Sequence, residues 1–485
     1  MEETKKNLAE RMIKSSSIYA FSGLLRNLVG FVMLPIYTRY LSPADYGIVA
    51  LMIFVISLIE ITLGARMGHA PQKFYYEQDA EAERKKVIST ALLITAFFSL
   101  IVTILAISQS EAISHFLYGS SALGSVVALF LTLITTQAVE AIGLIYIRIE
   151  NRTTLYFWLS LIKLITQVAA NIFCIVYLDL GVLGMATATA FSSVAFAGVI
   201  LLYVIRRAGL VLNAKVGVSM LLYSIPLWFS GLVSLYIGSS NRYLMSIYTT
   251  LEEIGLYSLA ERLAAVVGVL IFSPFISYWS AERFRLQDRP DFDEIHQEVF
   301  KSVYVVLILV GLAICLYSDF ILGVLAEESF QGAAKAIPYL VMGSIFFSLA
   351  QFYQYSFLSR NKTGVISKIM NITALGTTIF NFLLIPLWGF VGAAIAVSFS
   401  YFSLLLLSRH FAAPIYDMQL PLGRFFLSLS IAAIGVVLAA GLDANPFTLQ
   451  GFCLLAVLYF LVAISILKVN FRLKEVRGYF VQWRA

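Results

Sequence analysis

The sequence predicts an all-α membrane protein built as a bundle of about fourteen transmembrane helices. Of its 485 residues, 60% are hydrophobic and only 13% are charged, and the mean hydropathy is +0.86. Soluble proteins carry charge on about a quarter of their residues. The apolar runs recur along the whole chain and have the length of a membrane helix, about 20 residues. Because they lack the short alternating segments of an outer-membrane barrel, helices are the expected spanning elements.

The first predicted helix covers residues 18–40 and is long enough to cross a hydrocarbon core of about 30 Å. Its apolar run nevertheless contains Arg26 and Asn27. Together with Ser22, Gly23 and Gly30, these residues recur at steps of three and four and so share one stripe of the helix. We expect this stripe to face protein or water and not lipid.

Thirteen further apolar runs follow, separated by charged or turn-rich breaks. The first half of the chain contains five of them, the second half contains six, and two come last. Their predicted ranges are residues 47–67, 87–107, 121–147, 155–177 and 182–205, then 216–237, 254–279, 299–317, 336–358, 364–387 and 391–407, and finally 422–441 and 449–467. The predicted organisation is an N-lobe at residues 1–210, a C-lobe at 211–413, and two peripheral helices with a cytosolic tail at 414–485.

The distribution of basic residues predicts the orientation. Most of the 34 Lys and Arg residues fall in the N-terminus and in alternate loops, whereas Arg39, Arg242 and Lys335 fall on the other side. Since cytosolic loops are enriched in Lys and Arg, both termini are predicted to be cytosolic. The charged N-terminus precedes an apolar run without a cleavage site, so we interpret it as a retained cytosolic start and not as a signal peptide.

The two halves resemble each other at an offset of 208 residues. Gly181 to Ser192 aligns with Gly389 to Ser400, and half of these positions are identical. The same offset pairs Ser22, Gly23, Gly30 and Gly47 with Ser230, Gly231, Gly238 and Gly255. An offset of 210 pairs Asn151 with Asn361 and Asn171 with Asn381. A duplicated unit with an even number of helices keeps its orientation, so a ligand path is expected between two similar lobes.

Ionisable side chains inside the spans are the first candidates for function, because each one costs about 2.5–3.5 kcal/mol to insert at the membrane centre. These residues are Arg26, Glu60, Arg66, Glu140, Lys163, Glu261 and Arg262, with Arg242 near the end of a span. Counted from the cytosolic ends, the four charges Arg26, Glu60, Glu140 and Lys163 share one level. They can pair as salt bridges that join helices, or they can serve a ligand and a coupling ion.

A cavity that holds Arg26, Lys163 and Arg262 suits an anionic ligand such as a phosphate, because guanidinium groups bind its oxygens in pairs. The carboxylates of Glu60, Glu140 and Glu261 leave a zwitterionic ligand or proton coupling open. Arg26 has Ser234 as its counterpart in the second half. Arg39, Arg66 and Arg242 lie near helix ends, where they can also extend to headgroups. Asn381 can form helix-to-helix hydrogen bonds or line the lumen.

The sequence lacks common motifs for nucleotide hydrolysis and for metal binding. No Gly precedes a Lys, so the chain has no Walker A motif. The four histidines form no HExxH motif, and the three cysteines lie far apart in apolar runs. We therefore expect no enzyme activity, no cofactor, no metal site and no nucleic-acid partner.

Three segments resemble a known family. LPIYTRYLSPADYGIVAL at residues 34–51, IPLWFSGL from Ile225 and EEIGLYSLAERLA from Glu252 are similar to the polysaccharide-repeat-unit flippases of the Wzx type. These flippases, which serve O-antigen and other lipopolysaccharide units, belong to the multidrug/oligosaccharidyl-lipid/polysaccharide exporter superfamily. The resemblance covers the whole chain.

The resemblance implies two six-helix lobes and two peripheral helices in the bacterial inner membrane. The implied activity is ion-driven transfer of an undecaprenyl-pyrophosphate-linked oligosaccharide to the outer leaflet, with a polymerase and a chain-length regulator as partners. Arg26, Asn27, Arg66, Lys163, Arg242 and Arg262 are the predicted substrate-binding residues, and Glu60, Glu140 and Glu261 are the predicted coupling residues.

Three alternatives stay open. Lipid II flippases share the two extra helices but have an Arg-Asp pair where this chain has Arg26-Asn27. A drug/cation antiporter would depend on carboxylates of the lumen. A non-transporting scaffold for polysaccharide assembly would use the buried charges as structural pairs.

Overall fold

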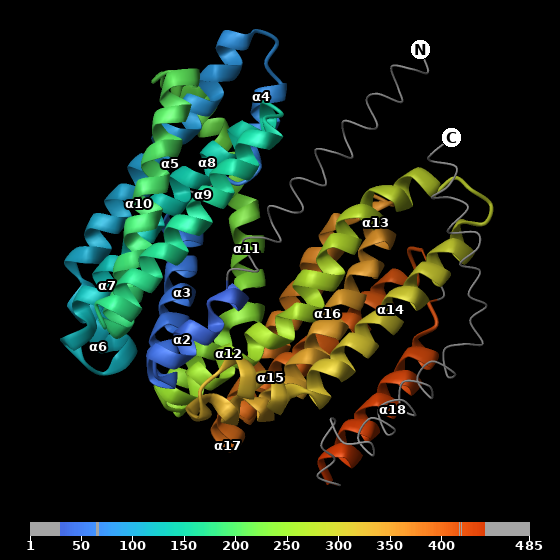
Figure 1. Cartoon of the computed structure of the whole chain (residues 1–485). Helices are drawn as coiled ribbons and strands as arrows, with labels where there is room; N and C mark the ends of the chain where they lie inside the picture. The colour runs from blue at the N-terminus through green and yellow to red at the C-terminus, as the bar shows by residue number, and fades with distance from the viewer. Residues whose placement is uncertain (1–29, 65–66, 417, 419, 442–485) are drawn as a thin grey trace. The chain divides into compact units, whose positions relative to one another are not determined.

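The computed structural model describes residues 30–64, 67–416, 418 and 420–441, and these residues form helices joined by turns, with no strand among them (Figure 1). Ten helical segments in this part are long and apolar enough to cross a membrane. They are Pro43–Leu63, Glu81–Ser108, Ser121–Ile149, Thr153–Tyr177, Gly181–Ala208, Ala214–Tyr248, Leu251–Leu286, Phe292–Leu316, Glu328–Leu358 and Thr363–Ala412. The predicted all-α membrane class is confirmed.

The predicted spans agree with these segments. The predicted runs 364–387 and 391–407 are two helices that follow each other directly within α17 (Thr363–Ala412) and meet at Gly389, whose φ of 54° is not helical. The predicted run 422–441 is helix α18 (Leu422–Gly441). The predicted run 449–467 and most of the first predicted helix lie outside the described residues. The total of fourteen spans therefore stays a prediction.

The described residues divide into two compact units. The first takes its residues from Met1–Leu259, Val324–Ala333 and Ala374–Val397, and the second from Ala260–Gly323, Ala334–Thr373 and Ser398–Ala485. The helices of the first unit are α2 (Leu34–Tyr40), α3 (Pro43–Leu63), α4 (Ala70–Tyr76), α5 (Glu81–Ser108), α6 (Ser110–Tyr118), α7 (Gly124–Leu131), α8 (Leu133–Ile149), α9 (Thr153–Ile172), α10 (Gly181–Ala208) and α11 (Ala214–Tyr248).

The second unit is built from the later helices. It contains α13 (Ser273–Leu286), α14 (Phe292–Leu316), α16 (Ile337–Leu358) and α18, whereas α12 (Leu251–Val266), α15 (Ser318–Leu325) and α17 contribute to both units. Two short π-helical segments, Phe173–Tyr177 and Val267–Phe272, continue α9 and α12. The 3₁₀ segments are Ser121–Leu123 and Glu328–Ala336. The two units are groups of residues that contact one another, and their boundaries differ from those of the predicted lobes. The lobe boundaries stay a prediction.

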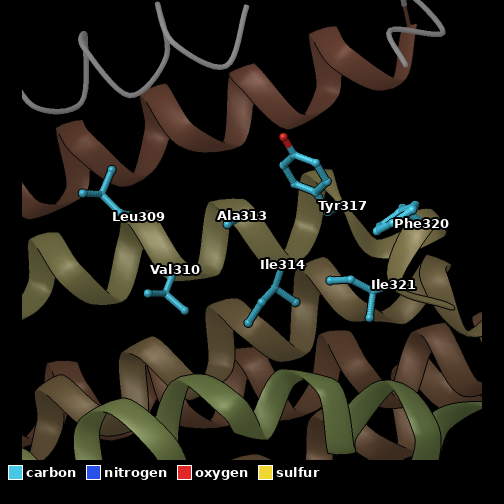
Figure 2. A pocket seen from close by; sticks show the side chains of 7 residues that line it. All are labelled: Leu309, Val310, Ala313, Ile314, Tyr317, Phe320 and Ile321. Atoms are coloured by element: carbon cyan, nitrogen blue, oxygen red, sulfur yellow. The ribbon is translucent and has the colours of Figure 1, made fainter. Parts of the chain in front are cut away.

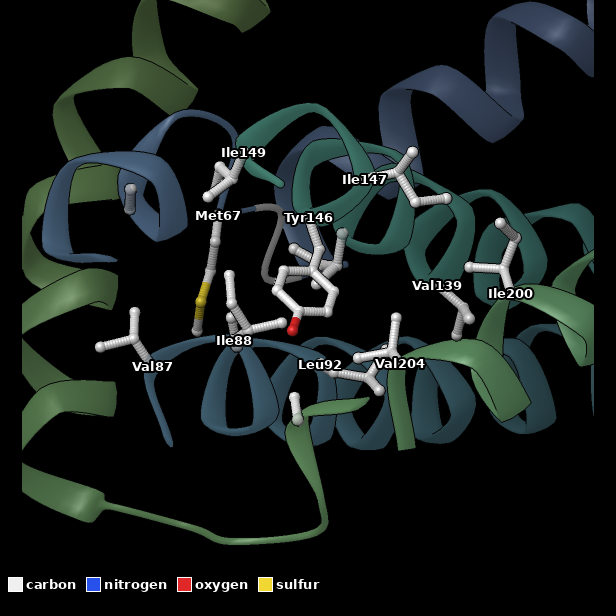
Figure 3. Packing of buried hydrophobic residues seen from close by; sticks show 14 of the residues in the cluster. Met67, Val87, Ile88, Leu92, Val139, Tyr146, Ile147, Ile149, Ile200 and Val204 are labelled. Atoms are coloured by element: carbon white, nitrogen blue, oxygen red, sulfur yellow. The ribbon is translucent and has the colours of Figure 1, made fainter. Parts of the chain in front are cut away.

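The core of the first unit forms where α5, α8 and α10 pack together (Figure 3). Tyr146 of α8 is 1% exposed and lies among Ile88 and Leu92 of α5. Gly143, one turn earlier on α8, allows α10 to approach closely, because a Cβ there would lie 2.1 Å from the Cγ2 of Ile200. Small residues at a helix crossing allow the close van der Waals packing that holds helices together in lipid.

Aromatic side chains form the core of the second unit. Phe300 of α14 and Phe352 of α16 are fully buried and meet edge to face at a centroid distance of 5.1 Å. Tyr304 of α14 contacts Phe425 of α18 in the same geometry at 5.7 Å. Edge-to-face pairs stabilise beyond their buried area, so these contacts bind α18 to the unit.

Backbone geometry supports the internal duplication. Asn151 and Asn361 both adopt a φ of 54°, and each precedes a helix that begins two residues later, at Thr153 or Thr363. Gly181 and Gly389 adopt a φ of 53° and 54°. Positive φ is uncommon for residues other than Gly, so shared membrane composition alone does not explain its recurrence at paired positions.

Candidate functional site

Glu140 and Lys163 form an ion pair inside the first unit. Glu140 lies on α8, nine residues before the end of that helix, and Lys163 lies on α9, ten residues after its start. Since α8 and α9 are joined by a short turn, residues equally far from the turn come to the same height, here about 15 Å along the helices. The Glu140 side chain is 8% exposed and that of Lys163 is 20% exposed.

A third helix completes the surroundings of this pair. The Nζ of Lys163 lies 5.0 Å from the ring centroid of Phe196 on α10, a cation–π contact. The pair therefore joins α8, α9 and α10 and compensates the charge of Lys163. This is the salt-bridge arrangement that the sequence left as an alternative to ligand binding. Chemically, such a pair can be opened by protonation of the carboxylate or by an anion that competes for the ammonium group.

Glu60 is the second buried carboxylate of the first unit. It lies on α3 and is 6% exposed. Its backbone carbonyl accepts a hydrogen bond from Gly64 at the end of the helix, at 3.2 Å. The two predicted coupling carboxylates of the first half are thus buried at helical positions, as expected for intramembrane charges with a partner.

The other predicted site residues are distributed differently. Arg26, Asn27 and Arg66 lie outside the described residues. Arg242 lies on α11 in the first unit and is partly buried. Glu261 and Arg262 lie on α12, in the part that belongs to the second unit, and are also partly buried.

Amide and hydroxyl hydrogen bonds link α11 to α17 within the first unit. Asn381 donates to Ser240 Oγ at 3.4 Å and is fully buried, so it makes a helix-to-helix hydrogen bond of the predicted kind. The hydroxyls of Tyr236 and Thr378 lie 2.7 Å apart. This second contact could not be predicted, because a Tyr and a Thr 142 residues apart form no sequence motif.

Both repeats contribute to one helix crossing in the first unit. Gly47 of α3 and Gly255 of α12, paired by the offset of 208, lie against each other. A Cβ on Gly47 would be 2.0 Å from the carbonyl oxygen of Leu251, and a Cβ on Gly255 would be 1.8 Å from that of Pro43. The equivalent helices of the two halves therefore meet backbone to backbone.

Glu253 connects the start of α12 to the break in α17. Its Oε2 accepts a hydrogen bond from the backbone N–H of Phe390 at 3.1 Å, directly after Gly389. Helix α2 contacts the end of α15 and the residues that follow it. The hydroxyl of Thr38 donates to the carbonyl of Leu325 at 3.0 Å, and the exposed Arg39 pairs with Glu327 at 3.5 Å. Segments of the second half are thus hydrogen-bonded to the first half at this end of the unit.

Helix α6 is fixed to α3 nearby. The Tyr118 hydroxyl donates to the carbonyl oxygen of Ile48 at 3.0 Å. Burial raises the pKa of Tyr118 well above its usual value, so the hydroxyl keeps its proton and stays a donor.

An apolar hollow of about 530 Å³ lies on α14 and α15 in the second unit (Figure 2). It is lined by Leu309, Val310, Ala313, Ile314, Tyr317, Phe320 and Ile321. This lining carries no charged side chain and is therefore unsuited to a phosphate. Among the described residues, no group of three His, Cys, Asp or Glu side chains could hold a metal ion.

Comparison with known families gives one match over more than half of the chain. Residues 12–278 match the model of a family described as polysaccharide biosynthesis protein. An uncharacterized membrane protein of Methanocaldococcus jannaschii is 29% identical over 140 residues, a stretch that spans 28% of this chain and only 27% of that relative's length.

Comparison with solved structures identifies similar folds. The lipid II flippase MurJ in an inward closed conformation matches with a TM-score of 0.74 and 18% identity, over 95% of this chain and 99% of that one. An inward-facing multidrug resistance MATE family transporter of the MOP superfamily matches with a TM-score of 0.60 and 12% identity, over 81% and 95%. A MATE transporter of Vibrio cholerae matches at 0.54 and 13%, over 85% and 98%.

Proposed function

The chain belongs to the polysaccharide biosynthesis protein family, and we propose that it is a flippase of the Wzx type. Its proposed substrate is an undecaprenyl-pyrophosphate-linked oligosaccharide, which it transfers from the inner to the outer leaflet of the bacterial inner membrane. The observation that carries this proposal is the family match together with a transporter fold, since MurJ matches over 95% of the chain. A polysaccharide family with a flippase-like fold favours a lipid-linked sugar as cargo.

The proposed substrate contact is the first predicted helix. Arg26 engages the pyrophosphate, because a guanidinium group matches two phosphate oxygens at once. Lys163 and Arg262, with Arg66, Arg242 and Asn27, are the further proposed contacts. The sugar crosses through the polar interior while the isoprenoid chain stays in the bilayer.

The ion pair between Glu140 and Lys163 suggests how ion coupling and substrate binding are connected. An anionic substrate reaching Lys163 must compete with Glu140, and protonation of Glu140 removes that competition. We propose that the pair couples the two events: a proton on Glu140 frees Lys163 for the substrate. Glu60 and Glu261 are the other proposed coupling groups.

A second candidate function is lipid II transfer, favoured by the high structural similarity to MurJ. Asn27 argues against it, because the resemblance places an Asp after the Arg in lipid II flippases. A drug antiporter and a membrane scaffold are the remaining alternatives. Association with a polymerase or a chain-length regulator is proposed from the family alone.

Complementation tests the proposed function. A strain that lacks its polysaccharide-unit flippase receives the wild type or Arg26→Ala at matched membrane levels, and surface polysaccharide is measured. The wild type should restore it and Arg26→Ala should lower it at least tenfold. Full restoration by Arg26→Ala would refute the pyrophosphate contact, and rescue of a MurJ-depleted strain instead would favour lipid II transfer.

The charge pair has its own matched control. Glu140→Gln with Lys163→Met should stop transport while leaving folding intact, because the neutral pair avoids an uncompensated buried charge. The exposed pair Glu81–Lys85 on α5 serves as the control, and its neutralisation should leave polysaccharide within about twofold of wild type, as surface pairs contribute little. Equal activity of both double variants would limit Glu140 and Lys163 to a structural role.

A further inference from the structure

Three buried side chains with N–H groups lie together on α13 and α14 of the second unit. Arg283 is 3% exposed, His296 is 1% exposed and Trp279 is 4% exposed. Trp279 and Arg283 are four residues apart on α13 and therefore share one face of that helix. The cluster lies close to the turn between the two helices, since Arg283 is three residues before the end of α13 and His296 four after the start of α14.

Ring contacts hold the cluster together. The imidazole of His296 lies 5.6 Å from the Trp279 ring and 5.9 Å from that of Tyr355, centroid to centroid. The guanidinium carbon of Arg283 lies 5.4 Å from the Tyr355 ring and 5.7 Å from that of Phe284. Cation–π contacts of this kind favour the buried charge but supply no hydrogen-bond acceptor in the plane of the guanidinium.

The nitrogen atoms of this cluster lack hydrogen-bond partners, and in a neutral imidazole one ring nitrogen is a donor and the other an acceptor. Nε and Nη1 of Arg283, both ring nitrogens of His296, and Nε1 of Trp279 have no hydrogen-bond partner within the part of the chain that the structure describes. A buried donor left without an acceptor costs about 1–3 kcal/mol, and more when it is charged. Several such donors in one place therefore indicate a missing acceptor.

Neighbouring cations on the same hairpin differ from Arg283. Arg285 pairs with Glu282, Arg289 with Asp291 at 2.8 Å, and Lys301 with Glu298 at 2.5 Å. Arg283 forms no ion pair among the described residues. Each of these three cations thus has an acidic partner on the hairpin, whereas Arg283 has none among the described residues.

The chemistry of the missing acceptor follows from the donors. Guanidinium, imidazole and indole N–H groups complement an anion with several oxygens, as in a phosphate ester. The height of the cluster, within about one turn of the ends of two predicted spans, is the level at which lipid headgroups lie. The basic loops on this side predict that it is cytosolic, where anionic lipids attract basic residues.

We propose that Arg283, together with His296 and Trp279, binds the phosphoester headgroup of a membrane lipid at the turn between α13 and α14. The long side chain of Arg283 can extend toward the turn while its stem stays buried. The headgroup belongs either to an anionic phospholipid or to a polyprenyl pyrophosphate. The site uses none of the residues assigned to transport and does not rest on the proposed function.

Lipid binding to the purified full-length protein tests the site. Native mass spectrometry in detergent measures the affinity for phosphatidylglycerol, for undecaprenyl pyrophosphate and for diacylglycerol, which has no phosphate, and inorganic phosphate is the competitor. At least one phosphorylated lipid should bind about tenfold more tightly than diacylglycerol. Arg283→Gln should remove that difference, whereas the control Arg285→Gln on the same helix should keep it within about twofold.

The pattern of losses identifies the source of the phosphate. Loss of phosphatidylglycerol binding alone assigns the site to a phospholipid, loss of undecaprenyl pyrophosphate binding alone assigns it to the isoprenoid carrier, and loss of both assigns it to either headgroup. Inorganic phosphate that competes as strongly as the lipids would overturn the lipid assignment.

A structural role for Arg283 predicts a different result. In that case Arg283→Gln lowers the melting temperature of the lipid-free protein but keeps the preference for phosphorylated lipids, which would overturn the proposal. If Arg283→Gln does not fold, His296→Phe decides, because a phenyl ring keeps the aromatic packing and removes both nitrogens. Wild-type lipid binding by His296→Phe would then overturn the site, and a several-fold loss would support it.

Discussion

Helices α3 and α12 begin at equivalent positions of the two repeats, yet their first acidic residues bind different partners. At the start of α3, Asp45 accepts hydrogen bonds from the backbone N–H and the hydroxyl of Ser42, at 3.0 and 2.8 Å, which closes a capping box. At the start of α12, Thr250 still accepts from the N–H of Glu253 at 3.2 Å. The Glu253 carboxylate instead binds Phe390 of α17.

The acidic residue in the first turn of each helix has a local partner in α3 and a partner on another helix in α12. Ser42 and Thr250, like Asp45 and Glu253, are 208 residues apart, so both pairs begin a helix. The Glu side chain is one methylene longer, and its carboxylate lies against Gly389, where a Cβ would be 2.4 Å from Oε2. A cap that acts within one helix in the first repeat thus joins two helices in the second.

The largest expected effect comes from the crossing that both helix starts share. Gly255→Ala places a methyl group 1.8 Å from the carbonyl oxygen of Pro43, so α3 and α12 must separate. We expect the free energy of unfolding to fall by about 3 kcal/mol, which is at the upper end of the range for overpacked cores. Thermal unfolding in detergent measures it, with Gly268→Ala on the adjoining π-helical segment as the control, since nothing lies within 4 Å of a Cβ there. Equal stability of the two variants would contradict the crossing.

The next largest difference is expected between Gly181 and Gly389, two positive-φ glycines at paired positions of the repeats. Gly181→Ala introduces only backbone strain, about 1 kcal/mol, because nothing lies within 4 Å of its Cβ. Gly389→Ala introduces the same strain and also displaces Glu253, so we expect the free energy of unfolding to fall by about 2 kcal/mol. In a Glu253→Ala background the effect of Gly389→Ala should fall to that of Gly181→Ala. Additive losses in this double-mutant cycle would show that Glu253 and Gly389 do not interact.

The smallest expected effect concerns the capping box itself. Asp45→Ala should lower stability by about 1 kcal/mol, the usual loss for a helix cap. The reciprocal exchange Asp45→Glu tests whether side-chain length decides the partner, and it should weaken the box without creating a contact to another helix. A stability above wild type for Asp45→Ala would rule out a capping role.

Much of the fold could be predicted from the sequence because membrane helices are encoded by length and hydropathy. The runs at residues 121–147 and 422–441 agree with the observed helices to within two residues. The absence of a loop between the runs 364–387 and 391–407 could not be predicted, because one helix ends and the next begins at Gly389 itself.

Less of the candidate site could be predicted. Counting residues from the ends of the spans placed Glu140 and Lys163 at one height, but which charges pair depends on helix packing. Phe196 beneath Lys163 and the donor cluster around Arg283 have no local motif. They are recognised by burial and by missing hydrogen-bond acceptors, which are properties of the packed structure and not of spacing along the chain.

Transport by the purified protein tests the proposed function most directly. Proteoliposomes receive a fluorescent undecaprenyl-pyrophosphate-linked oligosaccharide in the inner leaflet, and its arrival in the outer leaflet is followed by a membrane-impermeant quencher. Since either orientation of the protein can occur in vesicles, proton or sodium gradients of both directions are imposed. We expect protein-dependent transfer that Arg26→Ala abolishes. Transfer no faster than in protein-free vesicles, with folded wild-type protein under every gradient, would contradict it.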